Sequence, residues 1–386
     1  MPTATADLSQ SGMPRSLAPE AAFHRRIAIV GAGTAGHIYP ALVVGENYEQ
    51  THTNVDLLFI GTPHGLESRL IPVYGHRLHM VEGSPLHGVG LTSKLASLKR
   101  LLFGFVKARH LLQANGTKLV IGFGGYGSGA ALLAGLSLGL RTVIHEANEV
   151  PGLTNKFLGR LVDRVYLGGG TAAWAFPKSK TLVTGNPIRP EIGAGRQRRA
   201  KVPGSPVHIL VTGGSQGSAF LNRNAPELLT KVQDHGIRVE ITHQTGEFDP
   251  TPVKEVYKTA GLSASVVPYI EDMPRAYGRA DFAVACSGSQ TIAELAASRL
   301  PALLVPLSGS AGDHQAANAR VFAEAGGGFW VREESWNVDS LSARMASFLG
   351  DIERWKRASD SAGRLATPNA AWELISDCEA LMDGRW

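Results

Sequence analysis

Residues 27–44 read IAIVGAGTAGHIYPALVV, and this stretch decides the fold of the first half of the chain. An apolar strand runs into Gly31, Gly33 and Gly36 and then into a helical pattern, which is typical of a doubly wound α/β domain. Glycines let the backbone pass close to a ligand, and free amides at a helix start favour an anion such as phosphate. We therefore expect a phosphate-receptive turn between this strand and this helix.

The same G-x-G-x-x-G spacing is also the fingerprint of a dinucleotide site. A nicotinamide cofactor needs an acidic residue about 20 positions further on, at the tip of the second strand, to hold its ribose. The second strand, VDLLFIGTPHG at 55–65, ends in Ile60, Gly61 and Thr62 without a carboxylate. An NAD-dependent oxidoreductase therefore remains only as an alternative, and a structural glycine-rich turn is the simplest reading of the stretch alone.

The composition is that of a globular chain with room for two domains. Of its 386 residues, 44% are hydrophobic and 18% are charged, and no run of 18 or more apolar residues predicts a transmembrane helix. The two cysteines, Cys286 and Cys378, favour reduced thiols in a cytoplasm, because no secretory signal is evident. Residues 1–23 are rich in Ala, Ser, Pro and Thr, and we expect them to form a disordered extension.

Positive charge is concentrated in one interval of the chain. The net charge is +5, but no acidic residue lies between Glu82 and Glu146. The basic residues in that interval are Lys94, Lys99, Arg100, Lys107, Arg109, Lys118 and Arg141. This pattern predicts a basic face suited to an anionic surface or substrate, and no nucleic-acid partner is expected.

Apolar strand-like runs alternate with helical patterns along the whole chain, which predicts parallel sheets built from βαβ units. Strands are predicted at 25–31, 56–61, 77–83, 118–125, 141–147, 164–168 and 181–187, and again at 207–218, 239–246, 264–270, 282–288 and 302–307. We expect two Rossmann-like domains facing each other across a cleft. Their predicted limits are an N-terminal domain at 24–190, a linker at 191–206, a second domain at 207–365, and a C-terminal helix within 366–386 that packs back on the first domain.

Ligands of open α/β sheets bind at the carboxyl ends of the strands, and most unusual residues follow those ends. The motifs there are GFGGYGSG (122–129), HEANEVPGLTNK (145–156), TGNPIR (184–189), GGSQGS (213–218), YIEDMPRAYGRAD (269–281), TIAELAA (291–297), LPALLVP (300–306) and DHQAANA (313–319). Together with GTAGHIYPAL (33–42), they resemble the MurG family in sequence and order, from about Arg25 to Gly327.

The resemblance implies a GT-B glycosyltransferase fold and an inverting transfer of N-acetylglucosamine. The donor is UDP-N-acetylglucosamine, and the acceptor is the undecaprenyl-diphosphate-linked muramyl pentapeptide, lipid I, which becomes lipid II. This reaction belongs to peptidoglycan synthesis, and thereby to cell wall biogenesis, cell shape and cell division. No tightly bound cofactor is implied, and the sequence shows no D-x-D pair for a divalent metal.

The resemblance also assigns donor-binding roles, residue by residue. Glu294 is expected to hold the ribose hydroxyls, the backbone at Ile270 to read the uracil edge, and Gln315 to hold the sugar hydroxyls. The remaining residues implied for UDP-N-acetylglucosamine are Thr34, Ala35, Gly36, Asn148, Arg189, Ser215, Gln216 and Gly217. A carboxylate that accepts hydrogen bonds from a ribose diol, and an amide that both donates and accepts at a sugar, are consistent with these roles.

The acceptor diphosphate is expected to lie on the glycine turns of the first half, namely Gly33, Gly36, Gly124, Gly125 and Tyr126. His37 is implied as the general base, since histidine titrates near neutral pH, with Asn148 and Arg189 completing the catalytic group between donor and acceptor. The simpler readings are that His37 only hydrogen-bonds its own loop, that Glu294 is a solvated helix carboxylate, and that Arg189 pins the linker.

Five residues depart from the usual family pattern. Ala32 and Ala35 add methyl groups where the acceptor diphosphate is expected to approach. Ala147 stands where glutamine is usual, and Glu149 stands where a small residue is common. Cys286 replaces an arginine, and we expect this to remove one positive charge near the donor. These departures concern acceptor identity more than donor type.

Residues 91–112 predict a helix with Leu95, Leu98, Leu102, Phe105 and Val106 on one apolar face. Since lipid I lies in the cytoplasmic leaflet, we expect peripheral attachment to the inner face of the bacterial cell membrane through Lys94, Lys99, Arg100, Leu101 and Phe103. The alternative is that this face packs on the sheet of the first domain. Cell-wall synthesis proteins are further candidate partners.

Alternatives to the lipid I reaction remain from the sequence. A related enzyme could use a UDP-sugar with another lipid or small-molecule acceptor. A UDP-sugar 2-epimerase shares the two-domain architecture and needs no acceptor, and a non-catalytic protein would only bind the UDP-sugar.

Overall fold

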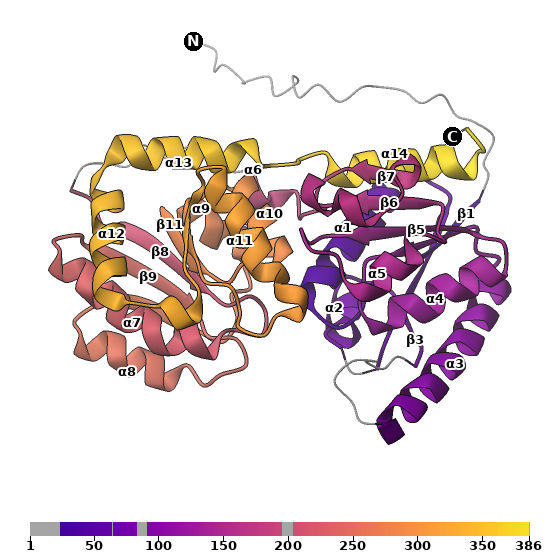
Figure 1. The fold of residues 1–386 in the computed structure, drawn as a ribbon, viewed down its shortest axis with the longest axis horizontal. Coiled ribbons are helices and arrows are strands. Elements are labelled where there is room, and N and C mark those ends of the chain that lie inside the picture. The colour runs from indigo at the N-terminus through magenta and orange to yellow at the C-terminus, as the bar shows by residue number, and fades with distance from the viewer. Residues whose placement is uncertain (1–23, 64, 83–90, 195–203, 386) are drawn as a thin grey trace, which may run out of the picture.

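The computed structural model describes residues 24–385 apart from His64 and the segments 83–90 and 195–203. Two α/β domains lie side by side, and each is built around its own sheet (Figure 1). The expected extension at 1–23 lies outside the described residues. This architecture, with a doubly wound sheet in each half, confirms the GT-B fold class.

The N-terminal domain contains a seven-stranded sheet with the order β3-β2-β1-β4-β5-β6-β7. Its strands are β1 (Arg25–Val30), β2 (Val55–Gly61), β3 (Leu78–Met80), β4 (Leu119–Gly122), β5 (Arg141–Glu146), β6 (Arg164–Leu167) and β7 (Thr181–Val183). The ladders are parallel, with Ile27 of β1 opposite Leu57 on one side and Leu119 on the other. The strand order reverses between β1 and β4, which is where open α/β sheets bind ligands.

The C-terminal domain repeats this plan with a six-stranded parallel sheet in the order β10-β9-β8-β11-β12-β13. Its strands are β8 (Val207–Thr212), β9 (Val239–Gln244), β10 (Ser263–Val267), β11 (Phe282–Ala285), β12 (Ala302–Leu304) and β13 (Gly328–Trp330). The twelve predicted strands are confirmed. The sequence did not predict β13, because its three residues leave no room for a recognisable alternation.

Helices cover both faces of each sheet. In the first domain they are α1 (Ala35–Thr51), α2 (Glu67–Val73), α3 (Leu91–Ala114), α4 (Tyr126–Ser137) and α5 (Leu153–Leu158), with the 3₁₀ turns η1 (Gly170–Ala175) and η2 (Lys178–Lys180). In the second they are α7 (Ala219–Asp234), α8 (Thr251–Thr259), α9 (Met273–Arg279), α10 (Ser289–Ala297), α11 (His314–Glu324), α12 (Val338–Gly350) and α13 (Ile352–Arg364), with η3 (Ala311–Asp313) and η4 (Glu333–Ser335). Within the described part of the chain, none of these helices is long and apolar enough to cross a membrane.

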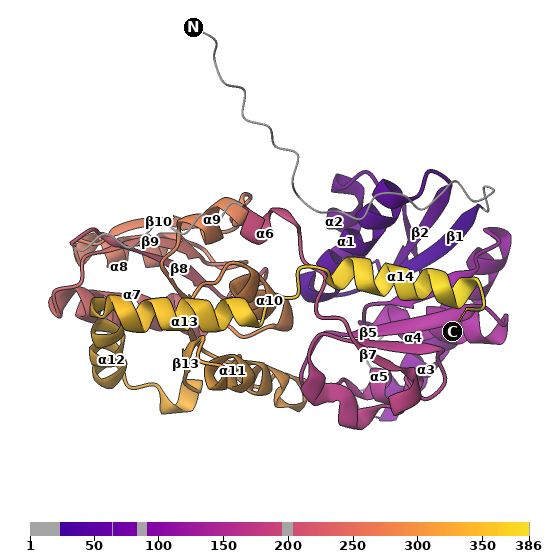
Figure 2. The ribbon, with the colours of Figure 1, turned by 90° about the horizontal axis from the view of Figure 1, so that it is seen from above.

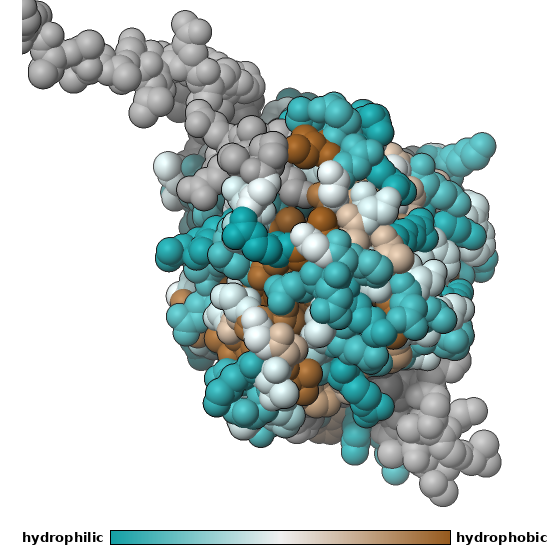
Figure 3. All heavy atoms as spheres, turned by 90° about the vertical axis from the view of Figure 1, so that its left-hand side faces the viewer, coloured by the Kyte–Doolittle hydropathy of each residue, from teal (hydrophilic) through white to brown (hydrophobic). Residues whose placement is uncertain are grey.

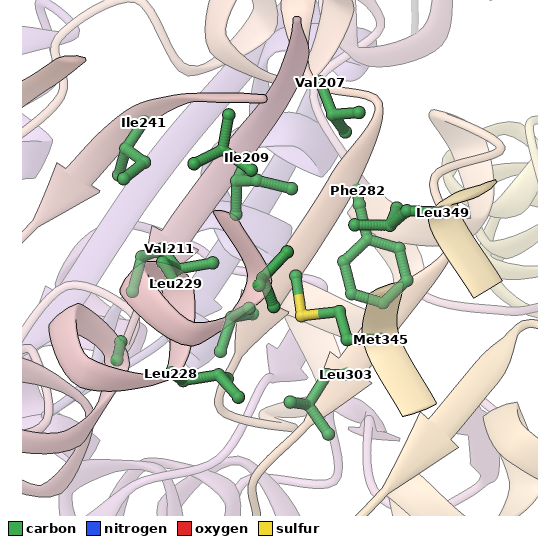
Figure 4. Packing of buried hydrophobic residues seen from close by; sticks show 14 of the residues in the cluster. Val207, Ile209, Val211, Leu228, Leu229, Ile241, Phe282, Leu303, Met345 and Leu349 are labelled. Atoms are coloured by element: carbon green, nitrogen blue, oxygen red, sulfur yellow. The ribbon is translucent and has the colours of Figure 1, made fainter. Parts of the chain in front are cut away.

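A core lies on each face of each sheet, because the strands are buried on both sides. Figure 4 shows one of the two in the C-terminal domain, where Ile209 and Val211 of β8 meet Leu229 of α7 and Met345 of α12. Figure 3 views the outer end of this domain, where hydrophilic side chains surround smaller apolar areas. The apolar side chains of the strands are therefore buried in the interior of each domain.

The segment after β7 begins to pack on the second domain before the predicted linker ends. Residues Glu191–Ala194 form α6, which contacts α9 and α10. Ile192 of α6 is buried among the side chains on the inner face of the second sheet. The residues 195–203 that follow lie outside the described structure.

The C-terminal segment returns to the first domain. Helix α13 packs on α10, the chain crosses over, and α14 (Ala370–Met382) packs on α1, as Figures 1 and 2 show in yellow. Leu374 and Cys378 of α14 are buried in the first domain's core, and Glu379 forms an ion pair with Arg25 of β1. The last helix is thus part of the N-terminal core although it comes last in sequence.

The two connections between the domains touch each other. Gly185, on the outgoing connection, has φ +89°, and a Cβ there would lie well inside contact distance of the Thr367 side chain on the returning connection. The carbonyl of Gly185 also accepts a hydrogen bond from Nε2 of the buried His145, at 3.0 Å. Only glycine fits at this crossing.

Replacing Leu374 with alanine should reduce the free energy of unfolding by about 2–5 kcal/mol, because a fully buried leucine leaves a cavity. Trp372 of the same helix is 57% exposed, so Trp372→Ala serves as the matched control and should change stability little. Chemical denaturation monitored by circular dichroism measures both. Equal effects of the two substitutions would contradict the docking of α14 in the core.

Candidate active site in the cleft between the domains

The two glycine turns of the first domain pack directly on each other. The amide of Ala32, after β1, donates to the carbonyl of Gly124, after β4, at 3.3 Å. Gly125 has φ +85°, and a Cβ there would collide with the carbonyl of Ala32. The switch point between β1 and β4 therefore places Gly33 and Gly36 beside Gly124 and Gly125, as the sequence predicts, while the side chain of Tyr126 lies outside what the structure describes.

His37 lies in the first turn of α1 and is held by the loop that precedes it. Its Nδ1 is 3.0 Å from the carbonyl oxygen of Ala32, so Nδ1 carries the proton and Nε2 presents a lone pair. A Cβ on Gly124 would lie 2.9 Å from Nε2, so glycine there leaves this nitrogen accessible. Desolvation lowers the pKa of His37 below its ordinary value, the nearby charge of His314 on α11 lowers it further, and Glu146 opposes both.

Glu67, in the first turn of α2, occupies part of the first glycine turn. Its Oε2 accepts from the amide of Gly33 at 2.9 Å, and its Oε1 accepts from the amide and hydroxyl of Thr62 at 2.8 and 2.7 Å. The carboxylate is fully buried. A carboxylate of the chain thus already binds the Gly33 amide, which the sequence does not predict.

The loop after β5 is organised by the buried carboxylate of Glu146. Its Oε1 accepts from the amide and side chain of Asn148 at 3.0 and 3.2 Å, and its Oε2 accepts from the amide of Gly152 and the side chain of Asn155 at 3.1 and 2.8 Å. Four hydrogen bonds fix the loop before any ligand binds. Asn148 is thereby held in position by a fixed loop.

Asn318 of α11 links this loop to the second domain by hydrogen bonds. Its Nδ2 donates to Oδ1 of Asn148 at 3.2 Å and to the carbonyl of Ser287, after β11, at 3.0 Å. Its Oδ1 accepts from the amide of Glu149 at 3.0 Å. The donor side of the cleft thus contacts the loop that bears Asn148 through one buried side chain.

Arg189 lies between the two domains, as its place in the sequence predicts. Its guanidinium stacks on the ring of Tyr39 of α1 at 4.5 Å, and its Nη2 is 3.5 Å from Oε1 of Glu294 on α10. Oε2 of Glu294 accepts from the hydroxyl of Tyr277 at 3.0 Å. Glu294 is only 6% exposed, so it is not a solvated helix carboxylate, and burial raises its pKa while Arg189 opposes that rise.

The turn after β8 matches the expected diphosphate site in position. Gly214 and Gly217 have φ +80° and +79°, and Ser218 caps α7 by accepting from the amide of Leu221 at 3.2 Å. Ser215 is half-buried and Gln216 is exposed at the start of this helix. The positive end of α7 therefore faces this turn, where an anion is favoured.

Gln315 of α11 is bound on its oxygen. Its Oε1 accepts from the amides of Ser287 and Leu307 at 3.2 and 3.0 Å. The sequence predicts that this side chain both donates and accepts at a sugar. In this arrangement its NH₂ group is the part suited to a ligand, so it would act as a donor.

The alanine and cysteine departures from the family pattern lie in packed surroundings. Ala32 is buried against the turn at Gly125. Ala35 is half-buried and packs on the first core. Cys286 is buried in the second domain's core, and desolvation raises the pKa of its thiol to about 12. The thiol lies beside the Ser218 side chain, at the end of the turn after β8. Ala147 is also buried, and its carbonyl accepts from Asn186 at 3.2 Å.

The predicted apolar face of α3 is divided in the structure. Phe105 packs against the first domain's core, as does the buried Ala108 on the same side of the helix, and Leu101 is half-buried. Leu102 and Phe103 are exposed at 63% and 72%, beside exposed Lys99 and Arg100. Of the predicted contact residues, Lys99, Arg100 and Phe103 are thus exposed and Leu101 is half-buried. The side chain of Lys94 lies outside the described structure.

Comparisons with known proteins agree with this architecture. Residues 27–167 match the N-terminal domain of glycosyltransferase family 28, and residues 208–373 match its C-terminal domain. The chain is thus a two-domain glycosyltransferase of family 28.

Within that class the similarity is closer. The chain is 38% identical over 351 residues to the UDP-N-acetylglucosamine–N-acetylmuramyl-(pentapeptide) pyrophosphoryl-undecaprenol N-acetylglucosamine transferase of Citrifermentans bemidjiense, covering 91% of this chain and 98% of that protein. It is 35% identical over 361 residues to the same transferase of Myxococcus xanthus, covering 94% of each. The crystal structure of MurG from Acinetobacter baumannii superposes with a TM-score of 0.73 at 27% identity, covering 91% of this chain and 98% of that one. The chain belongs to the MurG family.

A UDP-N-acetylglucosamine 2-epimerase superposes with a TM-score of 0.65 at 13% identity, covering 94% of this chain and 98% of that one. At this identity the likeness shows the fold alone.

His37 should titrate below its ordinary pKa of 6.5, because desolvation disfavours the imidazolium. The side chain is then neutral at pH 7 and gains its proton only at lower pH. Histidine ring signals followed by NMR across pH 4–8, assigned with a His37→Gln variant, measure the pKa. A value above 6.5 would contradict the arrangement.

Proposed function

We propose that this chain transfers N-acetylglucosamine from UDP-N-acetylglucosamine to undecaprenyl-diphosphate-linked muramyl pentapeptide. The observation that carries the proposal is the position of Arg189, which joins α1 beside His37 to Glu294 in the donor half. The cleft thus has His37, a neutral histidine whose ring is oriented by its own loop, on one side and the buried carboxylate of Glu294 on the other. The names of the 35–38% identical relatives give the same donor and acceptor.

On the donor side, Glu294 would accept hydrogen bonds from the ribose diol. The buried carboxylate already has Tyr277 and Arg189 as partners, and these hold its two oxygens in place. Ser215 and the start of α7 would receive the diphosphate, whose charge grows as the sugar leaves. Gln315 would donate to a sugar hydroxyl.

On the acceptor side, Nε2 of His37 would accept the proton of the attacking hydroxyl. The oxygen then bonds to the anomeric carbon, while the bond between that carbon and the diphosphate oxygen breaks and its electrons leave with UDP. The tautomer fixed by the Ala32 carbonyl suits this role. Because Glu67 engages Gly33, the acceptor diphosphate would use the start of α1 at Gly36 and the turn at Gly125.

The direct test is UDP release from UDP-N-acetylglucosamine with and without a short-chain lipid I analogue. We expect release that depends on the acceptor. Release without the acceptor would favour an epimerase or a hydrolase, and UDP binding without any release would point to a different acceptor.

His37→Ala and Glu294→Ala should fail in different ways. Loss of a general base should lower kcat by about 10²–10⁴-fold with UDP affinity kept, whereas loss of the ribose carboxylate should weaken UDP binding by about 10–100-fold. Turnover assays and calorimetric titration with UDP separate the two. A normal rate for His37→Ala would remove it as the base, and unchanged UDP affinity of Glu294→Ala would remove the ribose role.

The same protein is proposed to dock reversibly on an anionic membrane surface through α3. The contact surface comprises the exposed Leu102, Phe103 and Val106 with Lys99 and Arg100. Each basic residue near an anionic surface contributes about 1 kcal/mol, so the attachment is peripheral. It would bring the glycine turns to a lipid-linked acceptor.

Leu102→Ser combined with Phe103→Ser should weaken binding to phosphatidylglycerol vesicles about tenfold, because two apolar side chains no longer leave water. The matched control is Val256→Ser, an exposed apolar residue of α8 in the other domain. Vesicle co-sedimentation measures binding, and thermal melting checks the fold. Unchanged sedimentation of the double variant would contradict the proposal.

A further inference from the structure

Gln244, the last residue of β9, joins two loops of the donor half with one side chain. Its Nε2 donates to the carbonyl of Gly214, in the turn after β8, at 2.8 Å. Its Oε1 accepts from the amide of Ile270, after β10, at 3.2 Å. The side chain is 3% exposed, so both hydrogen bonds are shielded from water.

The two loops are already close, and Gln244 fixes their spacing. The amides of Thr245 and Gly246 donate to the carbonyls of Val267 and Pro268 at 2.9 Å each, which extends the β9–β10 ladder. Gly217, of the turn after β8, packs so closely on the carbonyl of Thr245 that a Cβ would collide with it. The carboxamide of Gln244 adds a direct link between Gly214, in the turn assigned to the diphosphate, and Ile270, the residue assigned to the base.

The bond to Ile270 has a chemical consequence for base recognition. The amide of Ile270 is engaged by Gln244, so we assign its carbonyl as the group that meets the base. A carbonyl oxygen accepts from N3–H of uracil, whereas the unprotonated N3 of cytosine would oppose it with a second acceptor. Unpaired acceptors in a desolvated site are costly, so the orientation of this backbone discriminates between the two bases.

We propose that Gln244 is a positioning residue that holds the Ile270 backbone relative to the diphosphate turn and thereby sets the preference for uracil over cytosine. The inference rests on the proposed UDP site and adds a determinant of its specificity. It also explains why a buried carboxamide, rather than an apolar residue, ends β9.

Tyr269, the neighbour of Ile270, extends this arrangement to the first domain. Its hydroxyl lies 2.7 Å from the hydroxyl of Tyr39 on α1, so the base loop is held from both domains. Gln244 supplies the contact from within the donor domain, because both of its partners belong to that domain.

The test is calorimetric titration of UDP and CDP into the full chain and its variants. Gln244→Met fills the same space without either hydrogen bond, and the UDP-over-CDP affinity ratio should fall about tenfold. Gln244→Glu keeps an acceptor for the Ile270 amide but opposes the Gly214 carbonyl and the diphosphate. Because it releases the bridge at the Gly214 end, it should weaken the binding of both nucleotides and also lower the UDP-over-CDP ratio.

The matched control is Asn222→Leu, because Asn222 of α7 bonds to the two neighbours of Gln244 in sequence. Asn222 donates to the carbonyl of Thr245 at 3.0 Å and pairs with His243 at 3.0 Å, but it does not bridge the two loops. This variant should melt at a lower temperature and keep the parent ratio. If Gln244→Met does not fold, Gln244→Asn, whose carboxamide is too short to reach both loops, should show the same loss.

The outcomes separate the two levels of the proposal. A parent chain that binds UDP and CDP equally would overturn the UDP site itself and the inference with it. A parent preference that Gln244→Met or Gln244→Asn retains would overturn the role of Gln244 alone.

Discussion

The buried ion pair between Arg189 and Glu294 is the constraint on which the cleft depends. Taking two charges out of water is costly unless further contacts compensate them. Here the Tyr277 hydroxyl donates to the carboxylate and the Tyr39 ring stacks on the guanidinium, whose Nε has no hydrogen-bond partner among the described residues. Removing one partner of such a pair leaves an uncompensated charge, at a cost of about 3–5 kcal/mol. Through the stack on Tyr39, the pair also contacts the first domain at the cleft.

Much of the fold could be predicted from local pattern. Continuous apolar runs such as 27–30 and 209–211 are followed by glycine turns, and this pattern is typical of parallel sheets. β13 escaped because its three residues have no periodicity, and the division of α3 was misjudged because helical spacing does not say which face packs. Gly104, which is buried against Glu82 and Ala130, is what orients that helix.

The site was predictable only where a motif carries it. Glycine turns and the residues beside them could be placed by position, but Glu67 and Gln244 are ordinary polar residues in the sequence. Their roles come from buried hydrogen bonds to backbone amides of other loops, and no local pattern announces such partners. Conversely, Cys286 and Ala32 looked exposed to ligand by their place in a motif, although their side chains point into the protein.

At Gly185 and Thr367 the outgoing and returning connections cross in contact, so two adjoining segments of chain join the domains. A single linker would let one domain swivel freely about the other, whereas two adjoining strands of chain resist torsion and leave bending as the easy motion. This resistance to torsion favours the one relative orientation in which Arg189 meets Glu294 and Asn318 meets Asn148. The alignment of the two half-sites thus depends on the C-terminal end of the chain, where α14 packs on the first domain.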